Sequence, residues 1–529
     1  MAITTAHSSE TLPDTPVLQA DVLVRGAGAP SALLAAALAQ GGQRVVLLRD
    51  PRGMRRTSDA STIPYAAELA LLIAGRFGLP EVASLALLED VSPALARVSG
   101  EKTNLGFCHH REGRSHEPGD SLQFQVPGEH AEWQPDRASL DTYAAGVAAA
   151  HGATVLGGDA REIEADATGV RLVSSADGLT ISVRILVDAT AGTVDEGRGR
   201  ARVLSADLAG VQPFERVLGG RRHGNVRPWS GGTLTHTFAG GYLQICHHGE
   251  QRPAGVTLVL SPDRADPELS GPAQVAAVLG GLPDMRAQLA YAQPVADWED
   301  SWAAPAHGPA ATGERVLAFA GGGGREPLLG RELTLGFEAV LATAPALLEA
   351  QAGAEGAALA AARARIAALT AHEDRHAAAL MASAHDFGLV NALLRVWLLE
   401  SIVRALALKR ARLDAAAAAD YTALDRGVGA FWFRVPRGLR GLVEASLADA
   451  EASARRELPP SVAERRIFKR LRRSRITPPL FDFGDPDARV YRFTASRRLR
   501  MLAWVKLRAP ADFRGLLTQE NVSAVRPRR

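Results

Sequence analysis

The sequence predicts an α/β protein with a doubly wound, mostly parallel sheet, an inserted antiparallel β layer and a helical C-terminal region. An apolar run at residues 21–25 passes through a glycine-rich turn into an Ala/Leu-rich helix, and a second apolar run follows at 44–48. A late apolar strand at 315–320 leads into a run of glycines. The middle of the chain is punctuated by Gly and Pro, whereas the residues after 346 have helical spacing.

The glycine-rich turn is typical of a Rossmann-like fold that binds dinucleotides. Gly26 permits the tight turn, Gly28 lets the backbone approach a pyrophosphate, and the helix that follows offers amide donors to phosphate. Ser31 stands at the third glycine of the pattern, and Arg49 ends the second strand where an acidic residue normally binds a ribose. The turn therefore predicts a nucleotide-binding architecture with an altered site.

Composition excludes several classes of protein. A chain of 529 residues, 47% of them hydrophobic, can form a large core and two or three domains. A net charge of +2 gives no general electrostatic reason to bind nucleic acid. Cys108 and Cys246 are the only cysteines, which excludes a disulfide scaffold. The sequence shows neither a signal-peptide pattern nor an apolar run that could span a membrane, so we expect a cytoplasmic protein.

The chain divides into three predicted parts. Residues 1–19 are polar and form a flexible N-terminal arm. Residues 20–345 form the nucleotide-binding domain, interleaved with a β-rich substrate layer at about 210–302. Residues 346–529 form the helical region, whose last part is rich in Arg and Lys. That charge could bind an acidic partner, but its spacing favours a solvated helix face.

The order of these motifs resembles that of the flavin-dependent halogenases, the branch of the FAD-dependent monooxygenases that includes the tryptophan halogenases. Segment 133–141 is similar to the part before the second helix of the FAD domain, 231–242 to a strand pair, and 327–335 to the late FAD loop. The resemblance covers roughly residues 21–348. It implies a glutathione-reductase-like fold, FAD as cofactor, and halogenase or monooxygenase chemistry of specialised metabolism on a small-molecule or carrier-protein-bound substrate.

The resemblance also implies site residues. Lys102 matches the essential lysine of the halogenases, which hydrogen-bonds or captures hypohalous acid; a solvated surface lysine is the alternative. Asp50 is a possible substitute for the missing ribose-binding acid. The other residues expected to contact FAD are Gly26, Gly28, Ser31, Arg137 and Pro327.

Several positions depart from the family's pattern. Ala320 stands where an Asp contacts the flavin, Glu332 replaces a glycine of the late loop, and the tryptophans of a Trp-x-Trp-x-x-Pro segment are absent from 242–247. One lost charge-assisted hydrogen bond costs about 1.5–3 kcal/mol, or roughly tenfold to hundredfold in affinity. We therefore expect weak or lost FAD binding. Two alternatives stay open: a FAD-independent enzyme of non-redox chemistry, such as a cyclase or isomerase, and a non-catalytic partner protein.

His372 and His376 are separated by one helical turn, with Glu373 between them, which is the pattern of a zinc-binding helix. The only candidate for a third ligand, Glu400, needs a second helix to fold back at the right depth. We therefore expect no metal at these histidines.

Two pairs of adjacent histidines, His109-His110 and His247-His248, fall in strand-like regions. Successive side chains on a strand point to opposite faces, so we expect one histidine of each pair to face solvent.

Overall fold

The computed structural model describes most of the chain. The described residues are 17–50, 61–126, 132–165, 169–174, 179–190, 201–219, 228–249, 252–303, 315–319, 328–350, 354–428, 435–491 and 494–516. Ala320 and Pro327 lie outside these ranges.

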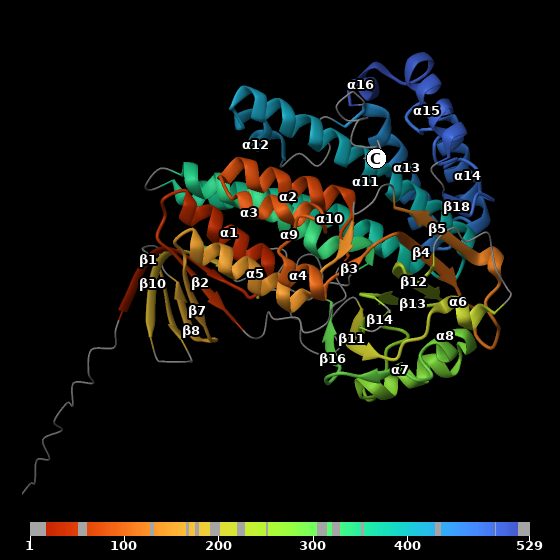
Figure 1. Ribbon diagram of the computed structural model, residues 1–529, viewed down its shortest axis with the longest axis horizontal. Coiled ribbons are helices and arrows are strands. Elements are labelled where there is room, and N and C mark those ends of the chain that lie inside the picture. Colours follow the sequence, from red (N-terminus) through yellow and green to blue (C-terminus); the bar gives the residue numbers. More distant parts are fainter. Residues whose placement is uncertain are drawn as a thin grey trace, which may run out of the picture.

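A seven-stranded sheet forms the nucleotide-binding layer (Figure 1). Its parallel strands are, in spatial order, β7 (Thr154–Gly157), β2 (Val45–Arg49), β1 (Val17–Arg25), β10 (Thr180–Asp188) and β17 (Val316–Ala318). β9 (Val170–Ser174) and β8 (Ala160–Ala165) continue the sheet in antiparallel orientation. The α/β fold class is confirmed.

Two details of this sheet differ from the sequence-based expectation. The first apolar strand and the late strand at 315–320 are expected from the sequence to be parallel neighbours. β1 and β17 are parallel strands of one sheet, but β10 lies between them, so they are not neighbours. Residues 17–19 belong to β1 and pair with β10, although the sequence assigned them to the flexible arm. Their pairing partners lie more than 150 residues away along the chain, so local composition could not reveal them.

Helices α1 (Ala29–Gln40), α5 (Arg137–Ala150) and α9 (Arg331–Glu349) pack together beside the parallel sheet (Figure 1). Every residue of α1 from Ala29 to Leu38 is buried, because its small and apolar side chains let both neighbours approach closely. Pro30 lies in the first turn of α1, where its missing N–H has no intrahelical acceptor to lose. α2 (Pro64–Phe77) covers α9 and begins just after residues 61–63.

A second, nine-stranded sheet carries the predicted β layer. Its strands are, in spatial order, β15 (Gln293–Pro294), β11 (Arg202–Ala209), β14 (Ala254–Leu260), β13 (Gly241–Cys246), β12 (Gly232–Phe238), β4 (Asn104–His109), β5 (Ser121–Gln125) and β18 (Val490–Tyr491), with β16 (Glu299–Trp302) beside β11. The sheet therefore extends beyond the range 210–302, because β4, β5 and β18 join it from distant parts of the chain. All residues of β12, β13 and β14 are buried, which shows that both faces of this part are covered.

Three short helices, α6 (Phe214–Leu218), α7 (Gly271–Gly280) and α8 (Pro283–Gln288), lie along the second sheet (Figure 1). Between the two sheets, β3 (Gly100–Glu101) pairs with β6 (Trp133–Gln134).

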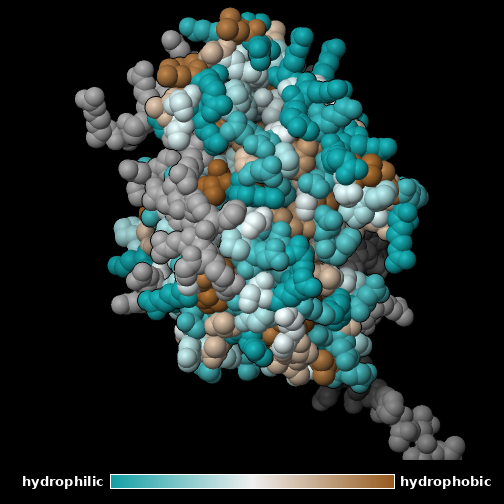
Figure 2. Space-filling model, turned by 90° about the vertical axis from the view of Figure 1, so that its right-hand side faces the viewer, coloured by the Kyte–Doolittle hydropathy of each residue, from teal (hydrophilic) through white to brown (hydrophobic). Residues whose placement is uncertain are grey.

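The C-terminal region is mainly helical, as expected, although β18 ties it to the second sheet. Its longest helices, α10 (Glu355–Ala382) and α11 (Phe387–Ala418), are joined by a short connection and lie against each other. They are followed by α12 (Thr422–Val428), α13 (Arg437–Ala454), α14 (Pro460–Arg473), α15 (Ala495–Leu507) and α16 (Ala511–Arg514). Figure 2 shows a mostly hydrophilic face with scattered hydrophobic side chains. None of the described helices combines the length and the apolarity needed to cross a bilayer.

Candidate functional site

The parallel strands of the first sheet end at one edge, and an ionic cluster occupies it. Arg25 ends β1, and its guanidinium contacts three carboxylates that end or follow neighbouring strands. The N···O distances are 2.8 Å to Asp50, 3.3 Å to Asp159 and 3.3 Å to Asp188. We call these four residues the sheet-edge cluster. It lies at the edge where open α/β sheets bind their ligands.

Asp50, which the sequence offered as a ribose-binding acid, is enclosed by this cluster. Its side chain is fully buried and accepts a hydrogen bond of 2.9 Å from Arg25 Nε. Burial raises the pKa of Asp50 to about 6, although Arg25 acts in the opposite direction. The carboxylate faces an arginine and not solvent, which argues against its predicted role.

The turn before α1 retains the backbone shape of a phosphate-binding loop. A Cβ at Gly26 would lie 2.7 Å from both Ala189 Cβ and Ser31 Oγ, so only glycine fits there. The Ser31 hydroxyl is buried, and none of the described residues forms a hydrogen bond with it. However, the first amide of α1 is already engaged, because Ala29 N–H donates to Asp141 Oδ1 at 2.7 Å. Burial raises the pKa of Asp141 to about 6.

Arg137 and Glu332, two positions that sequence analysis singled out, form an ion pair. Arg137 lies in the first turn of α5 and Glu332 in the first turn of α9, and their side chains meet at 3.1 Å. Both are buried. The glutamate that replaces a glycine in the late loop thus acquires a partner on a neighbouring helix.

Lys102 is buried between the two sheets. Its side chain is 1% exposed, and Nζ donates to Glu132 Oε2 and to the Thr62 carbonyl oxygen, both at 2.6 Å. The alternative of a solvated surface lysine is therefore wrong.

Residues 61 and 62, which contact Lys102 through the Thr62 carbonyl, also pack against the start of α9. Thr233 Oγ1 donates to Ser61 Oγ at 3.0 Å. Gly330 has a left-handed φ of 68°, and a Cβ there would lie 2.8 Å from the Ser61 carbonyl oxygen. Residues 61 and 62 therefore connect the lysine to the loop that precedes α9.

A small apolar cavity of about 20 Å³ lies between the second sheet and the C-terminal helices. Phe107, Thr237 and Tyr242 line it from the sheet, and Leu380 and Leu394 close it from α10 and α11. The space holds about one water molecule, so a larger ligand needs side chains to move.

Both predicted histidine pairs are buried on both members. The exposed fractions are 2% for His109 and His110, 8% for His247 and 6% for His248. The expectation that one of each pair faces solvent is wrong, because both faces of this part of the sheet are covered. Burial lowers the pKa of His109 and of His247 to about 4. These rings are therefore neutral at pH 7.

Another group of buried polar residues lies where α9, α10 and α11 meet. Arg404 of α11 donates to Glu338 and, at 3.0 Å, to Glu373, and its nearest approach to Glu400 is 3.9 Å. Glu400 accepts hydrogen bonds from two histidines, of 2.9 Å from His372 Nε2 and 2.8 Å from His376 Nε2. We call these six residues the helical cluster.

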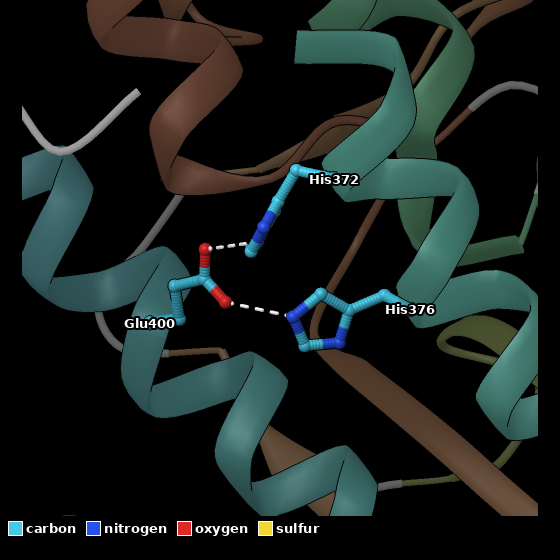
Figure 3. A group of neighbouring side chains, drawn as sticks. All are labelled: His372, His376 and Glu400. Atoms are coloured by element: carbon cyan, nitrogen blue, oxygen red, sulfur yellow. Dashed lines mark hydrogen bonds and ion pairs between the residues drawn. The ribbon is translucent and has the colours of Figure 1, made fainter. Parts of the chain in front are cut away.

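This geometry corrects the argument made from sequence against a third ligand. α11 does fold back at the depth that brings Glu400 between His372 and His376 (Figure 3). The two histidine side chains are also withdrawn from solvent, with exposed fractions of 9% for His372 and 2% for His376.

Comparisons with known proteins place the chain. No family model matches it. A tetracycline 7-halogenase of Kitasatospora aureofaciens is 30% identical over 309 residues, which span 53% of this chain and 54% of that protein. The monodechloroaminopyrrolnitrin halogenase PrnC of Pseudomonas fluorescens is 25% identical over 533 residues, or 93% of this chain and 92% of that protein. The chain is therefore similar in sequence to two halogenases, to one of them over about half of that protein's length.

The fold of the chain agrees with these sequence similarities. The crystal structure of halogenase PltM matches 89% of the chain with a TM-score of 0.79, at 19% sequence identity and over 99% of PltM. PltM has also been solved in complex with phloroglucinol and FAD. The fold is therefore shared, over 89% of the chain, with a halogenase that has been solved with FAD.

The residues around the turn before α1 fit FAD in part. Gly26 and the buried Ser31 hydroxyl suit the close approach of a phosphate, whose oxygens accept hydrogen bonds. The Asp141 carboxylate occupies the first amide of α1 and would repel the two negative charges of a pyrophosphate. The chain therefore retains the glycine-rich turn that could contact a phosphate, but the Asp141 carboxylate lies beside this turn.

Sequence analysis missed Arg25, Asp159, Asp188 and Glu132. A signal was present for the aspartates, since each ends or closely follows an apolar run that forms a parallel strand. Acids at such positions meet at one edge of the sheet. Glu132 carried no signal, because nothing local places it against Lys102.

Proposed function

We propose that this protein is a flavin-dependent halogenase or monooxygenase-type oxidoreductase of specialised metabolism that binds FAD weakly. The observation that carries the proposal is Lys102, a buried amine held between the two sheets and against residues 61 and 62. Its relatives in sequence are halogenases. Bound FAD would supply the redox chemistry, with Gly26, Gly28, Ser31 and Arg137 as its proposed contacts.

Lys102 is suited to hold a reactive oxygen species or to move a proton. An ammonium group has three N–H donors, and Glu132 and the Thr62 carbonyl accept two of them. No residue in the described part of the chain accepts the third, and we propose that it donates to an oxidant or to a substrate atom. Glu132 fixes the direction of Nζ and can receive its proton, since the two groups are in direct contact.

We propose that the substrate binds at the apolar cavity between the second sheet and α10 and α11, and that the side chains lining this cavity move apart to admit it, since the cavity now holds about one water molecule. Its apolar lining selects an uncharged, flat or compact molecule. We propose a small molecule, presented free or on a carrier protein. A hollow of about 510 Å³ between α13 and α14 contains Arg466, Lys469, Arg470 and Arg473, a charge that suits an acidic carrier. Cys108 and Cys246 are free and buried, in keeping with a cytoplasmic protein.

Lys102→Met tests the proposal, combined with Glu132→Gln so that no buried carboxylate loses its partner. Enzyme, reduced FAD in excess and chloride or bromide are incubated with a panel of phenols, indoles and pyrroles, and products are identified by mass spectrometry. We expect the wild-type protein to form halogenated or oxygenated product. The double variant should lose at least roughly 100-fold in rate, the size of a general acid–base contribution, while its circular dichroism stays unchanged.

Glu132→Gln alone retains the lysine but removes the carboxylate that orients it, so this variant separates the role of the amine from that of Glu132. It should keep measurable turnover. Absence of any product from the wild-type protein, or an unchanged rate in the double variant, would overturn the proposal.

A further inference from the structure

The histidines and glutamate of the helical cluster form a closed, inward-pointing set of donor atoms. His372 and His376 project from one face of α10 and Glu400 projects toward them from α11 (Figure 3). Their candidate ligand atoms all lie within 4.8 Å of one another. The Glu400 side chain is 3% exposed, so this set of atoms is withdrawn from bulk solvent.

We propose that His372, His376 and Glu400 bind one divalent transition-metal ion, with zinc as the ion that the donor set fits best. Two imidazole nitrogens and one carboxylate oxygen are a ligand set that zinc takes in proteins. A tetrahedral ion with bonds of about 2.0–2.1 Å separates its ligand atoms by about 3.3 Å. In the present arrangement the two Nε2 atoms lie 2.9 and 2.8 Å from different oxygens of Glu400, and all candidate ligand atoms lie within 4.8 Å of one another, so metal binding needs small adjustments of these side chains.

The charge of the surrounding residues favours a cation at this place. Arg404 faces Glu338, Glu373 and Glu400, so one guanidinium stands among three buried carboxylates. A divalent ion bound by neutral histidines would compensate the remaining negative charge.

The site is structural and not hydrolytic. In a metal-dependent hydrolase the glutamate between the two histidines acts as general base on a metal-bound water. Here Glu373 is bound by Arg404 at 3.0 Å, and its side chain is 9% exposed. The Glu373 carboxylate is therefore not free to act as a general base at this site.

The metal would fix the roof of the proposed substrate cavity. Leu380 lies one turn beyond His376 on α10, and Leu394 lies on α11 before Glu400; both line the cavity. An ion that joins α10 to α11 would hold these two side chains at a set distance from the second sheet.

Elemental analysis of the full chain, purified without a histidine tag, tests the proposal. After gel filtration the wild-type protein should hold about one zinc per chain, and apoprotein refilled with Co²⁺ should show the visible absorption of a tetrahedral site. These two measurements need no variant, so they decide the question even where a substitution prevents folding. Wild-type protein that retains no zinc after refilling, and that gives no tetrahedral Co²⁺ spectrum, would overturn the proposal.

Three variants assign the metal to these residues. Glu400→Gln keeps the size of the side chain and removes its charge. Glu400→Gln and His376→Gln, each made alone, should lower the zinc content at least tenfold. His385→Ala, which removes an exposed histidine that follows α10, is the control and should retain full zinc. Zinc that persists in Glu400→Gln and His376→Gln, or disappears in His385→Ala, would place the metal elsewhere and refute the assignment.

Discussion

Two arginines, one at the edge of the parallel sheet and one in the helical tail, each face three carboxylates. In the sheet-edge cluster Arg25 meets aspartates that come from the ends of different strands. In the helical cluster Arg404 meets glutamates of α9, α10 and α11. Both clusters therefore contain more negative than positive formal charge.

The two clusters differ in the surroundings of their excess negative charge. At the sheet edge the side chain of Asp159 is 34% exposed, so water screens part of the charge. In the helical cluster no carboxylate that Arg404 faces is more than 9% exposed, and two histidines complete the group. We propose that the same excess opposes an anionic cofactor at the sheet edge and favours a metal cation in the helical cluster.

The largest expected difference concerns loss of the two arginines. Arg404→Met should lower the free energy of unfolding by about 3–5 kcal/mol, because it leaves buried carboxylates without a cation. Arg25→Met should cost less, about 1–3 kcal/mol, because Asp159 reaches water and Asp188 also accepts a hydrogen bond from Thr190 N–H. Urea denaturation measures both. Equal losses in the two variants would remove the distinction between the clusters.

A smaller effect follows from the carboxyl group of Asp141, near the sheet edge. Its pKa is raised to about 6 in the folded protein from an ordinary 3.8, so the folded state binds more protons between these values. Asp141 therefore lowers stability as pH rises from about 4 to 6, by about 1.4 kcal/mol per unit of pKa difference. Asp141→Asn should remove this dependence. Urea midpoints measured at pH 4, 5 and 6 test this prediction. The same change of midpoint with pH in the wild type and in the variant would contradict it.

The smallest expected effect is on FAD affinity. Titration followed by flavin fluorescence should give the wild-type protein a dissociation constant above about 1 µM. Asp141→Asn keeps an acceptor for Ala29 N–H but removes the negative charge, which should tighten binding about fivefold, as expected for about 1 kcal/mol at a helix N-terminus. Submicromolar wild-type affinity, or no gain in the variant, would show that the sheet edge does not oppose FAD.

Local sequence determined the elements of this protein. The turn at Gly26 and the helix after it, the late strand and the histidines one turn apart on a helix all follow from short-range patterns, and the structure contains each of them. Such patterns suffice because backbone geometry and the periodicity of apolar side chains are set by neighbours in the chain.

Only the tertiary structure decided which groups meet. The approach of Glu400 to His376, the pairing of Lys102 with Glu132 and the enclosure of Asp50 by Arg25 join residues 24 to 30 positions apart. The insertion of β10 between β1 and β17 joins residues far more distant. These contacts depend on the packing of whole helices and strands, and packing is fixed by the shape of the complete core, which no local pattern contains.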